Sequence, residues 1–120
     1  MAIKWTDATR VRARMKSGTS LTDAEIEKFI EENEGWLEVF LKDTTVSITS
    51  PGNPTNKAHL FGSALVEHMT IMDCKAAVPM SDRTLEEAFL TLNVSVDKVK
   101  MYMDLLNDKG IADFVRKGGS

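Results

Sequence analysis

The residues that most often carry chemistry in proteins are few in this chain and far apart. The two histidines, His59 and His68, lie in one predicted helix on nearly opposite faces, because a helix turns by about 100° per residue. They cannot bind one metal ion together from that helix, since a helical metal pair needs a spacing of about three or four residues. The single cysteine, Cys74, excludes an internal disulfide and a multi-cysteine metal site. We expect it to be a buried, unreactive thiol.

Motifs for nucleophilic or phosphate chemistry are also missing from the sequence. No serine, threonine or cysteine stands in a recognisable nucleophile motif. Residues 16–19, Lys-Ser-Gly-Thr, have the residue types of a phosphate-binding loop but neither its order nor a preceding strand. The glutamates between residues 31 and 38 are typical of a solvated helix face, since catalytic carboxylates need perturbed environments. The sequence therefore predicts a protein that is not an enzyme and that holds no cofactor or metal ion.

Charge is distributed unevenly along the chain, although the net charge is only −3. Residues 1–20 contain five basic residues and one acidic residue, a net charge of +4. Residues 21–44 contain eight acidic and two basic residues, a net charge of −6. Such asymmetry indicates electrostatic docking to a partner.

Cap residues and apolar residues at helical spacing recur along the chain and predict an all-α fold. Thr22 and Glu25 form a capping box at the start of a long amphipathic helix. Further helix N-caps are expected at Thr6, Asn56, Ser81 and Ser95. The expected helices span residues 7–16, 23–42, 57–77, 82–91 and 96–108. Gly110 is expected to close the last of them, before a final short turn that contains Ile111, Phe114 and Val115.

Residues 44–56 interrupt the helical pattern. β-Branched and polar residues alternate through Val46 and Ile48, and Pro51-Gly52 and Asn53-Pro54 then mark turns. We expect a long loop there, or a loop with a short extended arm. Because no repeat or second domain is visible, residues 1–120 are predicted to form one domain, a small bundle of about five helices.

Nothing in the sequence indicates a membrane protein or a secreted one. No apolar run approaches the roughly 18 residues needed to span a bilayer. The first 16 residues are charged and contain no apolar stretch of the kind a secretory signal needs. We expect the chain to be made in, and to stay in, the cytoplasm of the producing cell.

Three segments together resemble the head–tail connector (adaptor, or head-completion) proteins of tailed phages. Val11-Arg12-Ala13-Arg14-Met15 resembles the short first helix of that family. The segment from Leu21-Thr22-Asp23 to Phe29-Ile30 resembles the start of its long second helix, and Asp-Leu-Leu-Asn-Asp-Lys-Gly-Ile (104–111) resembles its closing segment. The chain departs from the family at Glu32-Asn33-Glu34, where an alanine pair is common.

The resemblance implies a structural virion protein at the head–tail junction. Such subunits form a ring, typically a dodecamer, below the portal protein, and the ring extends the DNA channel toward a tail or stopper protein. DNA would pass along the ring without specific binding. A basic first helix could then face the acidic second helix of the next subunit. The residues expected at this contact are Arg10, Arg14, Glu27, Glu31, Glu34 and Glu38, and those expected to reach the portal or tail are Val46, Ile48, Ile111, Phe114 and Val115.

Two other functions remain open from the residues alone. The chain could be another helical interaction protein of a virion or of the cytoplasm. It could also be a small DNA-binding regulator, since four basic residues lie between Arg10 and Lys16. Against a regulator, the protein is acidic overall, with a pI of about 5.4, and no predicted helix is rich in the side chains that read bases.

Overall fold

The computed structural model describes residues 5–15, 20–41, 57–77 and 85–116, and these residues form a small all-α bundle. Its helices are α1 (Ala8–Arg14), α2 (Asp23–Leu41), α3 (Lys57–Ala77), α4 (Leu85–Leu106) and α5 (Lys109–Arg116). Within the described residues there is no strand, so the predicted fold class is confirmed. The expected loop at 44–56, with Val46 and Ile48, lies outside the described residues.

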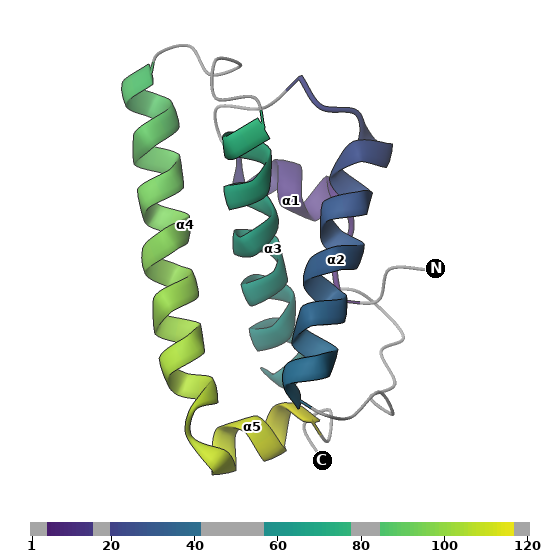
Figure 1. The fold of residues 1–120 in the computed structure, drawn as a ribbon, viewed down its shortest axis with the longest axis vertical. Coiled ribbons are helices and arrows are strands. Elements are labelled where there is room, and N and C mark those ends of the chain that lie inside the picture. The colour runs from purple at the N-terminus through teal and green to yellow at the C-terminus, as the bar shows by residue number, and fades with distance from the viewer. Residues whose placement is uncertain (1–4, 16–19, 42–56, 78–84, 117–120) are drawn as a thin grey trace.

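Helix α3 is the centre of the bundle. Figure 1 shows α3 between α2 and α4, with α1 crossing behind it and α5 lying across one end. Side chains are buried along α3 from Ala58 to Lys75, as expected for a central helix. The largest fully buried apolar side chains around it come from α1 and the segment before it, from α2 and from α5: Trp5, Val11, Ile26, Ile30, Leu37, Leu41 and Val115.

The capping box predicted at the start of α2 is confirmed. The hydroxyl of Thr22 accepts a hydrogen bond from the backbone N–H of Glu25 at 3.2 Å, and the Glu25 carboxylate accepts from the backbone N–H of Thr22 at 3.1 Å. These bonds lower the pKa of Glu25, because they favour its charged form. The second helix therefore begins where its local sequence placed it.

The cap of α1 differs from the expectation. Asp7, and not Thr6, is the N-cap, and its carboxylate accepts from the backbone N–H of Arg10 at 2.9 Å. Both residue types are good caps, so the local sequence could not separate them. The tertiary structure decided which residue caps the helix, because the Thr6 side chain is buried and its hydroxyl donates a hydrogen bond to Glu67 instead.

The expected break between the fourth and fifth helices is wrong. Helix α4 runs without interruption from Leu85 to Leu106 and contains neither glycine nor proline. Ser95, expected to cap a new helix, is buried in the middle of α4 and hydrogen-bonds to His68 at 3.2 Å. The serine resembled a cap in sequence but pairs with a buried side chain of another helix.

The expected role of Gly110 as a helix end is also wrong. Gly110 lies in the first turn of α5, and Asp108 provides the cap by accepting from the backbone N–H of Ile111 at 3.1 Å. The segment expected to be a short turn is therefore a helix of eight residues. It buries Ala112 and Val115 against the bundle.

Candidate functional site

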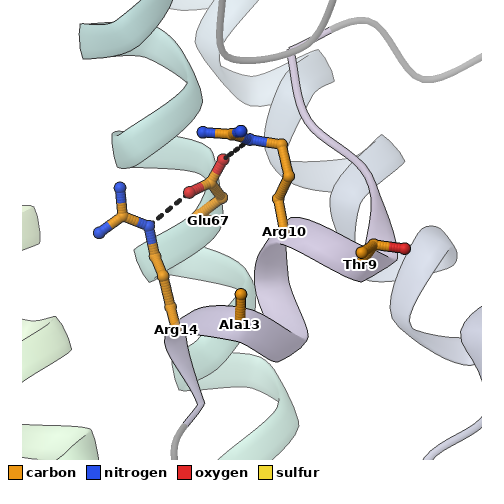
Figure 2. Close-up of a pocket in the computed structure, with 5 residues that line it drawn as sticks. All are labelled: Thr9, Arg10, Ala13, Arg14 and Glu67. Atoms are coloured by element: carbon orange, nitrogen blue, oxygen red, sulfur yellow. Dashed lines mark hydrogen bonds and ion pairs between the residues drawn. The ribbon is translucent and has the colours of Figure 1, made fainter.

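The carboxylate of Glu67 on α3 accepts hydrogen bonds from three side chains. Its side chain is 1% exposed, yet it is reached by two arginines that lie one turn apart on α1 (Figure 2). Arg10 donates from Nε to Oε2 at 3.0 Å, and Arg14 donates from Nε to Oε1. The Thr6 hydroxyl donates to Oε2 at 2.7 Å. A buried carboxylate that accepts from three donors, two of them on arginines, fixes both arginine side chains in place.

Residues before α1 are held by a second buried carboxylate, Glu34 of α2. Its Oε2 accepts from the backbone N–H of Trp5 and, at 3.3 Å, from that of Thr6. The Ser63 hydroxyl of α3 donates to the carbonyl of Trp5. The Trp5 indole packs directly on Gly62, where a Cβ atom would overlap its six-membered ring. Only glycine at position 62 leaves room for this indole, so Trp5 fixes the position of the segment before α1.

His68, next to Glu67 on α3, links this cluster to α4. Its Nε2 lies 3.4 Å from Nη1 of Arg14, and its Nδ1 lies 3.2 Å from the hydroxyl of Ser95. A guanidinium can only donate, so Nε2 is the acceptor and Nδ1 carries the proton. Burial, reinforced by the positive charge of Arg14, lowers the pKa of His68 to about 4. The imidazole is therefore neutral at neutral pH.

A shallow, solvent-open pocket of about 290 Å³ lies beside the arginine pair. It is lined by Thr9, Arg10, Ala13, Arg14 and Glu67. Figure 2 shows the carboxylate between the two guanidinium groups and the Thr9 hydroxyl directed away from them. The pocket thus has a positively charged edge on an otherwise acidic protein.

The residues predicted at a subunit contact occupy different environments. Arg10 and Arg14 lie together, and their side chains are 36% and 39% exposed. Glu27 is exposed, whereas Glu31 and Glu38 are half-buried. Glu34 is 5% exposed and bonds to the backbone of Trp5 and Thr6, so it stabilises the fold of a single subunit. The predicted contact itself remains a prediction.

The residues predicted to contact a portal or tail protein are only partly described. Val46 and Ile48 lie outside the described residues. On α5, Phe114 is 43% exposed, Ile111 is half-buried and Val115 is 1% exposed. Of the three predicted contact residues that the structure describes, Phe114 is therefore the most exposed.

Sequence reasoning missed Glu67 and Ser95 as members of the polar cluster. A signal for Glu67 was present, because it is one of only two carboxylates, with Asp73, in a helix expected to be buried on most sides. Such a group needs charged or hydrogen-bonding partners. No signal identified those partners, since Arg10 and Arg14 lie more than 50 residues away in the chain.

Cys74 is buried, as predicted. Burial, with the nearby charge of Asp73, raises the pKa of its thiol to about 11, which disfavours the reactive thiolate. Among the side chains that the structure describes, no three His, Cys, Asp or Glu residues gather where a metal ion could sit. None of the described helices combines the length and the apolar character required to cross a bilayer.

Comparison of the chain with protein-family models, with curated proteins and with solved structures finds no match.

Proposed function

We propose that this chain is a structural, non-catalytic subunit: a head–tail adaptor that forms a ring of identical copies below a phage portal and extends the DNA channel. In this proposal the ring closes by a head-to-tail contact between the basic α1 of one copy and the acidic α2 of the next. The portal and a tail or stopper protein bind its two ends. DNA passes along it without sequence-specific binding.

The observation that carries this proposal is the separation of unlike charges on one small bundle. Arg10 and Arg14 are held in place on α1 and remain more than a third exposed. The exposed Glu27 lies on a different helix, α2. Complementary charges at two different places on one chain favour a heterologous contact, and such a contact produces a ring when its rotation closes.

The exposed apolar residues of α5 support a separate contact with an end partner. Phe114 is 43% exposed, while Ala112 and Val115 of the same helix anchor it to the core. An apolar side chain on a firmly attached helix is suited to bind a hydrophobic pocket in a partner. None of the residues assigned to the ring contact lies on α5.

The test combines gene context with assembly. We expect genes for portal, capsid and tail proteins beside the gene for this chain. The chain, mixed with that portal and examined by native mass spectrometry and electron microscopy, should add a closed ring to it. Absence of portal and tail genes from the neighbourhood, or failure of the chain to bind the portal, would overturn the proposal.

A charge reversal tests the ring contact more sharply. Glu27→Lys should lower ring occupancy on the portal, because it places like charges opposite each other at every contact of the ring. Glu32→Lys is the matched control: Glu32 is exposed on the same helix but belongs to a different face. Equal occupancy for both variants would show that the face containing Glu27 does not form the contact.

A further inference from the structure

The arginine pair on α1 retains hydrogen-bond donors that the chain itself does not use. Each Nε is bonded to Glu67, and Nη1 of Arg14 lies by His68. Within the described residues, no acceptor bonds to either Nη atom of Arg10 or to Nη2 of Arg14. A guanidinium carries five N–H donors in a fixed fork, so most of the donor capacity of Arg10 remains available.

These donors are already oriented. Both Nε atoms bond to one carboxylate, which brings the two guanidinium groups within reach of a single small anion. Glu67 is itself fixed by burial and by the Thr6 hydroxyl. Long side chains normally lose rotamer freedom when they bind a ligand, and arginines that are ordered beforehand lose less.

The local charge favours an anion. Two guanidinium groups surround one carboxylate, which leaves a net positive charge at the edge of the pocket. His68 is neutral at neutral pH and adds no charge. Of the residues that line the pocket, only Glu67 is acidic, and its oxygens are already occupied by three donors.

We propose that the pocket formed by Thr9, Arg10, Ala13, Arg14 and Glu67 binds a phosphate group through the free Nη atoms of the two arginines. The donors come from two guanidinium groups on either side of Glu67 (Figure 2). A phosphate group presents three acceptor oxygens in different directions and carries more negative charge than a carboxylate, so it can accept from both guanidinium groups at once and is attracted more strongly. The pocket, at about 290 Å³, has room for a phosphate group.

The phosphate could come from a small molecule or from the backbone of DNA. Both sources present the same oxygens to the arginines, so the structure of the pocket defines the chemical group. The inference concerns the unassembled chain and does not depend on ring formation; in the proposed ring, the acidic α2 of the next copy would compete with phosphate for the same two arginines.

The experiment is a titration of the full ¹⁵N-labelled chain with inorganic phosphate at pH 7 and constant ionic strength, followed by NMR. The Nε–H signals of Arg10 and Arg14 and the amide signal of Ala13 should shift and saturate, with millimolar affinity. Acetate at the same concentrations should bind more weakly. In a parallel titration, a short DNA duplex that shifts the same signals and is displaced by phosphate would identify the backbone as the source. A duplex without effect would exclude the DNA backbone and leave a small phosphate compound as the source.

Two variants make the test specific. Arg10→Gln should weaken phosphate binding at least about tenfold, because it removes charge-assisted hydrogen bonds. Arg10→Lys keeps the positive charge but lacks the planar guanidinium group, and it should also bind phosphate more weakly than the wild type. It provides the test if Arg10→Gln is poorly folded. Arg12→Gln is the control, since Arg12 is on the same helix but bonds to Asp23 at 2.7 Å and does not line the pocket.

The proposal is overturned by any of three results. Shifts that grow linearly without saturation would show that only the ionic atmosphere changes. Equal effects of phosphate and acetate would show that the pocket does not select a tetrahedral anion. Equal loss of binding in Arg10→Gln and Arg12→Gln would show that net charge, and not the arginine pair, attracts the anion.

Discussion

The two sides of α3 differ in how the neighbouring helices are attached to it. On the side of α1 and α2, buried polar groups make directed hydrogen bonds: Glu34 to the backbone before α1, Glu67 to Arg10 and Arg14, and Asn33 to Thr70 and Asp73 at 3.2 and 3.0 Å. On the side of α4, aromatic and apolar packing dominates the described contacts. There Tyr102 packs edge-on against Phe61 with ring centroids 5.1 Å apart.

The difference shows which helices are held at fixed positions relative to α3. Apolar packing stabilises a helix but tolerates small shifts if volume is conserved. A buried hydrogen bond fixes one atom against another and is costly to break. The arginine pair lies on the side with directed bonds, so these two positive charges are held at fixed positions by hydrogen bonds to Glu67.

The largest expected loss of stability comes from removing the indole of Trp5, which anchors the segment before α1. Trp5→Ala should lower the free energy of unfolding by about 3–5 kcal/mol, because it empties a fully buried aromatic site. Trp36→Ala, at a tryptophan that is 39% exposed on α2, should cost only about 1 kcal/mol. Urea unfolding followed by circular dichroism measures both. Equal losses would mean that the first segment is not part of the cooperative core.

A somewhat smaller loss is expected at the buried carboxylate. Glu67→Gln should cost about 2–4 kcal/mol, because two guanidinium groups lose their counter-charge and an amide N–H₂ then faces them; the partial exposure of the arginines limits the loss. Glu32→Gln, at an exposed glutamate of α2, should change stability by less than about 0.5 kcal/mol. If both variants unfolded at the same urea concentration, the directed bonds of Glu67 would add no more stability than an exposed glutamate does.

The smallest expected effect concerns pH and His68 of α3, which makes a polar link to Ser95 of α4. Its pKa is about 4 in the folded chain and 6.5 as the ordinary value, so the unfolded chain binds the extra proton first as pH falls. Above pH 6.5 the neutral His68 side chain contributes about 1–3 kcal/mol to the free energy of unfolding. This contribution is lost as the pH falls toward 4. Unfolding free energies measured across this range should show a steeper decline for the wild type than for His68→Phe. Parallel profiles would show that His68 titrates normally.

The sequence determined the helical character of the chain and several of its helix boundaries. Helices were predicted at 23–42 and 57–77, and α2 and α3 span Asp23–Leu41 and Lys57–Ala77. The capping box at Thr22 depends on residues three apart, so its geometry is present in the local sequence. The apolar stripe of the long second helix likewise follows from spacing alone, since buried positions recur with the helical period.

Only the tertiary structure decided which polar residues are buried and what they bind. Glu34 and Glu31 belong to the same acidic stretch, yet Glu34 is 5% exposed because the backbone of Trp5 and Thr6 lies against it. Ser95 and Thr6 resemble caps in sequence but pair with His68 and Glu67 from other helices. A local pattern specifies which face of a helix is apolar. The partner of a single polar atom depends on how distant segments pack, because a hydrogen bond requires its two atoms to meet within about 3 Å.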